Sequence, residues 1–212
     1  GEAMSKAFKE LISKVRVGLL PADMFISINF SDRDSFLPNN TLDDGEDAEL
    51  IVTVMNKGKG SGYGTNLEVA SDNSRIAFEK NIVIGDIPAG GKRDIKINLK
   101  AAKDIGDGKA LFRVNLNENR GYNSKSVALN VPTSNQINRA IDNIVTEVIR
   151  QMRQKGWKRI AIAEIEPIDS SYAKLDKYLL KEFFNRFGHI KEISVVEKSL
   201  FDKTIKSIGS SF

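Results

Sequence analysis

Apolar residues at helical spacing open the chain. Between Glu2 and Arg16 they recur every three or four positions, which places them on one face of a helix. They are Ala3, Met4, Ala7, Phe8, Leu11, Ile12 and Val15. Pro21 ends this helix, because proline restricts the residue before it to extended conformations. We interpret the segment as a docking helix or the tail of a preceding domain. A membrane-surface helix is less favoured, since the polar face mixes both signs of charge.

From Asp23 to Val131 the period changes to two. Apolar and polar residues alternate in seven runs, and clusters of Gly, Pro, Asn and Asp separate them. The runs are Met24–Phe30, Glu49–Asn56, Asn66–Ala70, Ile76–Ile84, Asp94–Lys100, Ala110–Asn117 and Ser126–Val131. Short strands without helical segments between them predict a seven-stranded immunoglobulin-like β-sandwich.

After Pro132-Thr133, which we expect to be a hinge, helical and strand patterns alternate. The expected order is a helix from an N-cap at Ser134 to Gly156, a strand Arg159–Glu164, a helix from Ser170 or Ser171 to Gly188, a strand Ile190–Glu197 and a helix Ser199–Ile208. This order predicts a parallel α/β domain. With only two strands it is small, and we expect it to be incomplete.

The expected fold class is therefore a multidomain β plus α/β protein. Its domains are an N-terminal amphipathic helix at 1–21, the sandwich at 22–131 and the small, truncated α/β domain at 134–212. We interpret the chain as a fragment of a longer protein. No apolar run approaches the roughly 20 residues that span a bilayer.

Composition excludes several kinds of site. The 212 residues include no cysteine and a single histidine, His189. Disulfides, thiolate metal sites and multi-histidine metal sites are therefore impossible, and a Ser-His-Asp triad would need His189. We expect no catalytic residue and no cofactor. The net charge of +4 comes from residues after the hinge, where 14 basic side chains face 10 acidic ones.

Four glycines at positions 58, 60, 62 and 64 suggest a phosphate-binding loop. Such a loop needs a helix after it, but Thr65–Ala70 has the pattern of a strand. We therefore interpret the segment as a loop between strands.

An acidic segment is a candidate calcium site. Its carboxylates are Asp32, Asp34, Asp43, Asp44 and Glu46, with Asp47 beside them. Calcium prefers six to eight oxygen ligands, which one loop can supply. A solvated connection rich in turn-forming residues is the favoured alternative.

Five cations without an intervening acid lie at and after the end of the long helix, and the first three of them close it. They are Arg150, Arg153, Lys155, Lys158 and Arg159. Cations at a helix C-terminus are favoured by the helix dipole, and this is the preferred explanation. The alternative is a contact for an anion or a partner. Trp157 is a single aromatic residue rather than a stacking platform, so we expect no nucleic-acid partner.

Glu164, Glu166 and Asp169 lie at and after the end of a predicted strand, where open α/β sheets bind ligands. Paired carboxylates could serve acid–base chemistry. No nucleophile or metal ligand accompanies them, so a solvated strand end is preferred.

Two stretches resemble known families. Residues 41–56, TLDDGEDAELIVTVMN, followed by Lys57-Gly58-Lys59-Gly60, resemble the opening of CARDB-like bacterial immunoglobulin-fold domains. This resemblance covers residues 22–131 and implies fold more than function.

Residues 157–208 are similar to envelope lipoproteins of the CsgG/FlgO type. The matching features are the strand KRIAIAEIEP, a helix after Ser170-Ser171, and ISVVEKSL at 193–200. Lys198 stands where that family usually has arginine, and the lipidation cysteine is absent. The resemblance implies a non-enzymatic assembly role at the cell envelope.

From these observations we predict a non-enzymatic bacterial protein of the cell envelope that binds or assembles other proteins. Its expected partners are other envelope proteins or a second copy, and its expected location is the periplasm or outer membrane, with the cytoplasm as an alternative. Membrane association is expected only through parts outside this chain. The alternative function is an accessory region of a larger enzyme such as a peptidase, motivated by the amphipathic helix.

Overall fold

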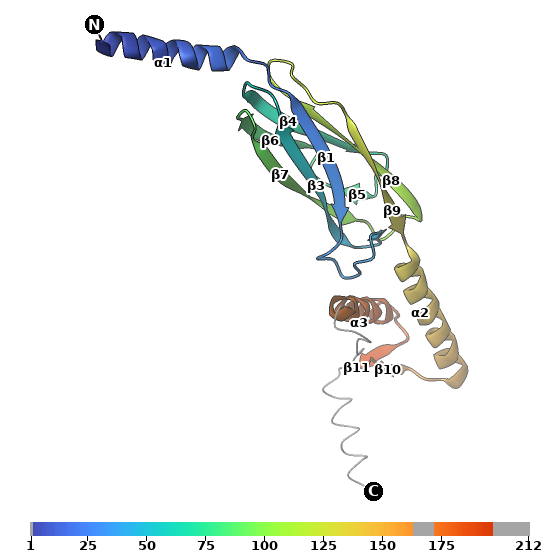
Figure 1. Ribbon diagram of the computed structural model, residues 1–212. Coiled ribbons are helices and arrows are strands. Elements are labelled where there is room, and N and C mark those ends of the chain that lie inside the picture. Colours follow the sequence, from blue (N-terminus) through green and yellow to red (C-terminus); the bar gives the residue numbers. More distant parts are fainter. Residues whose placement is uncertain (1, 163–171, 197–212) are drawn as a thin grey trace. The chain divides into compact units, whose positions relative to one another are not determined.

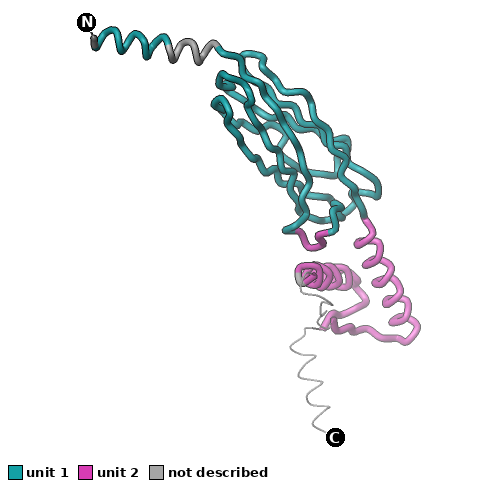
Figure 2. The backbone as a smooth tube through the Cα atoms, in the orientation of Figure 1, with its two compact units in different colours: residues 1–34, 39–134 teal, residues 35–38, 135–212 magenta. Residues whose placement is uncertain are grey.

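The structure is a computed structural model that describes residues 2–162 and 172–196; for residues 2, 13–19 and 173 it describes the backbone alone. The chain forms two compact units (Figure 2). The first unit comprises residues 1–34 and 39–134, and the second comprises 35–38 and 135–212.

The first unit contains one helix and nine strands (Figure 1). They are α1 (Glu2–Leu19), β1 (Met24–Ser31), β2 (Leu42–Asp43), β3 (Asp47–Asn56), β4 (Gly62–Ser71), β5 (Ile76–Ala77), β6 (Asn81–Ile87), β7 (Lys92–Ala101), β8 (Gly108–Asn117) and β9 (Val127–Ser134). One sheet has the order β1-β3-β7-β5, and the other has the order β2-β9-β8-β4-β6. Neighbouring strands are antiparallel except β2 and β9.

A single apolar core lies between these two sheets. Every second residue of β3 is buried, and the same alternation continues along β4 and β8. Fully buried members come from both sheets, among them Leu50, Val52, Leu67 and Phe112. Burying each such side chain contributes about 1.5–3 kcal/mol, so the shared core holds the sheets face to face. The prediction that the first part of the chain is rich in β-strands is confirmed.

The strands number nine rather than the seven expected. The predicted run Ile76–Ile84 is divided, because β5 pairs with β7 in one sheet while β6 pairs with β4 in the other. The ninth strand is β2, whose two residues are too few to show a period. The expected hinge Pro132-Thr133 lies inside β9, where Pro132 pairs opposite Lys109. β9 lies between β2 and β8, but β2 pairs only with Thr133 and Ser134, so Pro132 has a paired residue on the β8 side alone.

The second unit has its own small core. Its elements are α2 (Gln136–Lys155), β10 (Arg159–Ala161), α3 (Ala173–Gly188) and β11 (Ser194–Val196). β10 and β11 pair in parallel, with α3 between them in the chain. Ile141, Val145 and Phe187 are buried together. The Phe36 ring, from the short segment of this unit at 35–38, stacks on Tyr178 with 4.1 Å between ring centroids.

Helix ends in this unit differ partly from the prediction. Gly156 does end α2 with the left-handed backbone expected of a C-cap, at φ 67°. Ser134, the expected N-cap, is the last residue of β9, and Asn135 takes the position before the helix. The predicted strand Ile190–Glu197 begins only at Ser194, because residues 190–193 form a turn closed by the bond from Ile193 N–H to Ile190 O. The start of the second helix at Ser170 or Ser171 and the helix 199–208 lie outside the described residues.

Candidate functional site

β1 is an edge strand that presents an uncharged sequence, MFISINFS. Among the described residues β1 is hydrogen-bonded to β3 alone, so its other backbone edge has no strand paired with it, although part of β9 lies near β1. A groove of about 470 Å³ lies beside β1. We call it the β1 groove. It is lined by Asp23, Met24, Phe25, Ile26, Asn123, Ser124, Lys125 and Val127.

The β1 groove runs along the backbone edge of the strand. Met24 is buried in the core, whereas Phe25 is 40% exposed on the opposite face. Successive side chains of a strand point to opposite faces, so a groove that Met24, Phe25 and Ile26 all line must meet β1 edge-on. Residues 123–126, on the other bank, belong to no strand, and Ser124 N–H donates to Leu116 O of β8 at 3.2 Å.

The side chain of Asn56 fixes the residues just before β1, the strand that forms one bank of the groove. It is buried at the end of β3, and its Oδ1 accepts hydrogen bonds from Asp23 N–H at 3.1 Å and Gly58 N–H at 3.0 Å. Its Nδ2 donates to Gly60 O at 2.8 Å and Ile87 O at 3.0 Å. One amide therefore fixes the residues that lead into β1.

The four-glycine segment contacts the same stretch of chain before β1 that Asn56 holds. Gly60 N–H donates to Pro21 O at 3.0 Å, and a Cβ on Gly60 would lie 1.9 Å from Leu20 O. Only glycine permits this approach. β4 begins at Gly62, so a strand and not a helix follows; Gly58 and Gly60 lie in a loop between strands as expected, whereas Gly62 and Gly64 already belong to β4. We call Asn56 and residues 57–60 the clasp, because they hold the segment 20–23.

Glu118 organises the other bank. Its fully buried carboxylate accepts hydrogen bonds from the backbone N–H groups of Tyr63 at 2.8 Å and Arg120 at 2.7 Å, and from Arg120 Nε at 3.2 Å. Its own N–H donates to Asn123 Oδ1 at 2.7 Å. Burial raises the pKa of Glu118, but the hydrogen bonds from these N–H groups outweigh burial and lower its pKa below the ordinary value.

The guanidinium of Arg120 also packs against two aromatic rings. It lies 4.7 Å from the Tyr63 ring centroid and 5.0 Å from that of Tyr122. Such cation–π contacts, with the ion pair to Glu118, order the loop from 118 to 122. The bank at 123–125 therefore starts from a fixed position.

The predicted calcium residues mostly serve their own loop. Asp32 accepts hydrogen bonds from the N–H groups of Asn39 and Asn40 at 2.7 and 2.5 Å. Glu46 accepts one from Asp43 N–H at 2.9 Å. Burial raises the pKa of Asp43, although hydrogen bonds from Asn39 and Ser134 oppose this. Asp44 is buried and Asp34 is exposed. Over residues 2–162 and 172–196, no three acidic or histidine side chains converge as a metal site.

The five predicted cations differ in their contacts, and two of them, Arg153 and Lys158, line a common hollow. Arg150 pairs with Glu147 at 2.6 Å, and Arg153 pairs with Glu192 at 3.2 Å. Hydrogen bonds from Arg150 and Gln151 lower the pKa of Glu147 to about 2. Lys155 Nζ lies 4.5 Å from the Trp157 ring centroid. Lys158 and Arg159 are exposed and begin β10.

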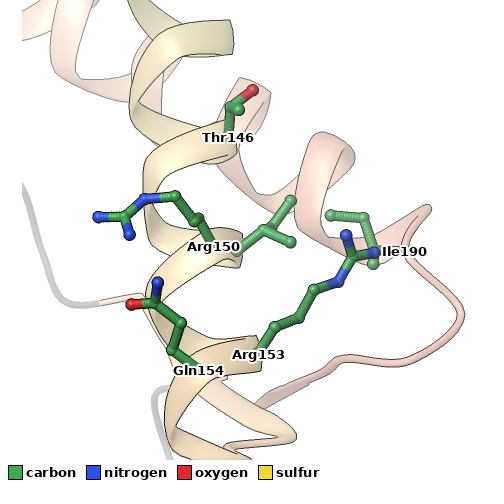
Figure 3. A pocket seen from close by; sticks show the side chains of 6 residues that line it. Thr146, Arg150, Arg153, Gln154 and Ile190 are labelled. Carbon is green, nitrogen blue, oxygen red and sulfur yellow. The ribbon is translucent and has the colours of Figure 1, made fainter.

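Two of these arginines line a second hollow, of about 540 Å³, beside α2. Figure 3 shows the Arg153 side chain extending toward Ile190, whereas the side chains of Arg150 and Gln154, on the same face of α2, extend away from Ile190. The two guanidinium groups therefore point in different directions. The anion contact stays a prediction, and the hollow offers little to support it.

Glu164, Glu166 and Asp169 lie outside the described residues. The His189 ring lies against Asn185 O, 2.5 Å from its Nδ1, just after α3. On α1, Met4, Phe8 and Leu11 are 79%, 63% and 57% exposed. Within the described residues, no helix has the length and apolar character required to cross a bilayer.

Sequence reasoning did not find the β1 groove. One signal was present, since β1 has eight residues without a charge. Charged residues usually protect open strand edges, as Lys92 and Lys96 do on the part of β7 that the short strand β5 does not pair with. Alternation alone does not tell an edge strand from a central one, so this signal could not be used.

Comparison with protein-family models and with curated protein sequences gives no match. Solved structures are similar to about half of the chain. One is the CARDB domain of the PF1109 protein from Pyrococcus furiosus, in complex with di-metal ions; it is 16% identical, the match covers 53% of this chain and 89% of that chain, and the TM-score is 0.39. It is the kind of module that residues 22–131 resemble in sequence.

Two further structures belong to proteins of different kinds. A conjugative transposon lipoprotein from Bacteroides eggerthii is 12% identical over 50% of this chain and 95% of that chain, with a TM-score of 0.34. A family 123 glycoside hydrolase from Clostridium perfringens is 11% identical over 52% of this chain and 26% of that chain, with a TM-score of 0.36. At these values the similarities say nothing of this chain's activity. The likeness of residues 157–208 to the CsgG/FlgO type stays a prediction.

Proposed function

We propose that the chain is a non-enzymatic protein of the bacterial cell envelope that binds and assembles other proteins. In this proposal residues 22–131 are an immunoglobulin-like, CARDB-like module, and residues 134–212 are a CsgG/FlgO-like α/β domain. The β1 groove is the binding site. Its occupant is an extended segment of another protein, which adds a strand to the edge of β1.

The edge-on position of the groove carries this proposal. β1 offers unpaired backbone groups along one bank, and residues 123–126 offer a second backbone on the other. A chain lying between them can form hydrogen bonds to either side, which is the basis of recognition by strand addition. Main-chain pairing supplies affinity, and apolar side chains of the occupant contact Met24, Ile26 and Val127.

The use of buried polar groups agrees with a binding role. Asn56 and Glu118 each direct several hydrogen bonds to backbone groups beside the groove. They hold both banks in place before any partner arrives. A preformed site loses less conformational entropy on binding, which favours affinity.

Placement at the envelope rests on the two sequence resemblances. They support the periplasm or the outer membrane as the location and other envelope proteins, or a second copy, as partners. The accessory-enzyme alternative has one observation in its favour, the exposed apolar residues of α1. Reading the complete gene product decides between the two, because an upstream catalytic domain would favour the alternative.

Site-specific photocrosslinking tests the proposal. A photoreactive amino acid replaces Ser124 in the groove, and the chain is produced in its source cells and irradiated. We expect a discrete covalent adduct with an envelope protein. Mapping the adduct should place the crosslink on an extended segment of the partner.

The matched control is the same replacement at Val83. This residue is 85% exposed on β6, an edge strand of the other sheet. It should give no adduct or a different one. Equal adducts at both positions, or none at Ser124, would contradict binding in the β1 groove.

A further inference from the structure

The charges around the β1 groove show a bias. Lys125 lines one bank, and on the β1 side Lys57 Nζ lies 4.1 Å from the centroid of the Phe25 ring. Both lysines are exposed. Asp23, at the start of β1, is the one acidic residue that lines the groove. One cation therefore lines the groove and a second lies over a ring that lines it, against one carboxylate at the residue before β1.

The apolar part of the groove is short. Met24, Phe25 and Ile26 extend over about 10 Å at the rise of a strand. That length accepts about three residues of an extended occupant. A carboxylate on such a segment can reach an ammonium group while its neighbours contact the apolar floor.

We propose that the partner segment is an extended peptide with an acidic residue flanked by apolar or β-branched residues. Its carboxylate pairs with Lys125 and Lys57, and its backbone pairs with β1. This inference rests on the proposed function, since it gives the chemistry of the occupant of the same groove. Complementary charge selects the partner more than it adds affinity.

Fluorescence anisotropy with labelled synthetic peptides tests this inference on the 1–212 chain. The first peptide alternates valine and threonine and carries a central glutamate. The second carries lysine in its place, and the third repeats the first with N-methylated backbone amides. We expect the glutamate peptide to bind about tenfold more tightly than the lysine peptide, and the N-methylated peptide to lose binding.

Charge reversal in the protein supplies the specific test. Lys125→Glu should remove the preference for glutamate or reverse it. Lys109→Glu is the matched control, because it makes the same change in charge at the start of β8, whereas the groove lies beside residues that follow the end of that strand. The control should keep the preference.

The outcomes separate the two proposals. If the glutamate and lysine peptides bind equally and N-methylation still abolishes binding, the acidic preference is wrong and strand addition stands. If no peptide binds while Ser124 still crosslinks, this occupant is wrong and the groove remains a binding site. If neither peptides nor crosslinks are found, both proposals fall.

Discussion

At the residue scale, buried polar side chains connect loops to one another through hydrogen bonds. Asn56 donates and accepts at once, which an amide can do and a carboxylate cannot. The carboxylate of Glu118 only accepts hydrogen bonds, and N–H groups surround it. A buried polar group that loses its partners costs about 1–3 kcal/mol. Each of these side chains therefore has a large effect on the stability of its loop.

Glu118→Gln should make stability less dependent on acid pH. The folded-state pKa of Glu118 lies below its ordinary value, so the carboxylate stabilises the fold above the unfolded pKa of about 4.3, and this stability is lost as pH falls through the folded pKa. Near pH 7 we expect the variant to lose about 2 kcal/mol, because its amide group faces N–H donors. Urea unfolding at several pH values measures the difference.

The comparison with wild type isolates one carboxylate. Other acids with lowered pKa values, such as Asp94, are present in both proteins and cancel. The difference in unfolding free energy between the two proteins should therefore narrow as the pH falls below about 4.3, the unfolded pKa of a glutamate. A gap that stays constant between neutral and acid pH would show that Glu118 does not act through its charge.

Residue roles were the hardest part to predict from the sequence. Asp32 and Glu46 were correctly noticed as an unusual group of carboxylates, but the sequence could not show that backbone N–H groups of the same loop would bind them. Asn56 and Glu118 were not noticed, since single polar residues at strand ends carry no pattern. Their partners lie up to 55 residues away along the chain.

At the element scale, periodicity predicted the strands well and the sheets poorly. The run Ile76–Ile84 alternates as one strand would, yet the chain leaves β5 in one sheet and enters β6 in the other. Inward-facing residues of either sheet meet the same core, so alternation continues through the crossing. For the same reason no pattern could show that β1 is an edge.

Gly60→Ala should weaken the clasp. The added methyl group would lie 1.9 Å from Leu20 O, so the backbone of one segment must move. We expect a loss of about 2 kcal/mol in the free energy of unfolding, by analogy with overpacked cores. Chemical denaturation followed by fluorescence or circular dichroism provides the measurement.

Gly188→Ala is the companion variant. A Cβ at this last residue of α3 meets nothing within 4 Å, so the change should be neutral or slightly stabilising. If Gly60→Ala were equally harmless, the close approach of the clasp to Leu20 would not be needed for stability.

At the scale of the whole molecule, each unit has a core made of its own residues. Members of the first core fall between Ala22 and Val131, and those of the second fall between Ile137 and Val195. The change from strand to helical period near residue 134 lies where the chain passes from the first unit to the second, but nothing in the sequence indicates that residues 35–38 belong to the second unit. Pro132 looks like a hinge in sequence but pairs within β9.

A fragment of residues 20–134 should fold alone. It contains the whole first core and the clasp. We expect the backbone amide resonances of the fragment to be dispersed in its NMR spectrum. We also expect the fragment to unfold at the same urea concentration as the sandwich does within the 1–212 chain. A fragment that is unfolded in water would show that the sandwich requires residues beyond Ser134 or before Leu20.

The clasp has a mechanical consequence. Tension applied at the N-terminal side of residue 20 does not first reach the ladder between β1 and β3. It meets Gly60 N–H bonded to Pro21 O, Lys57 N–H bonded to Asp23 O, and the Asn56 amide. These bonds share the load, so a force on the N-terminal side would have to break them before β1 could separate from β3.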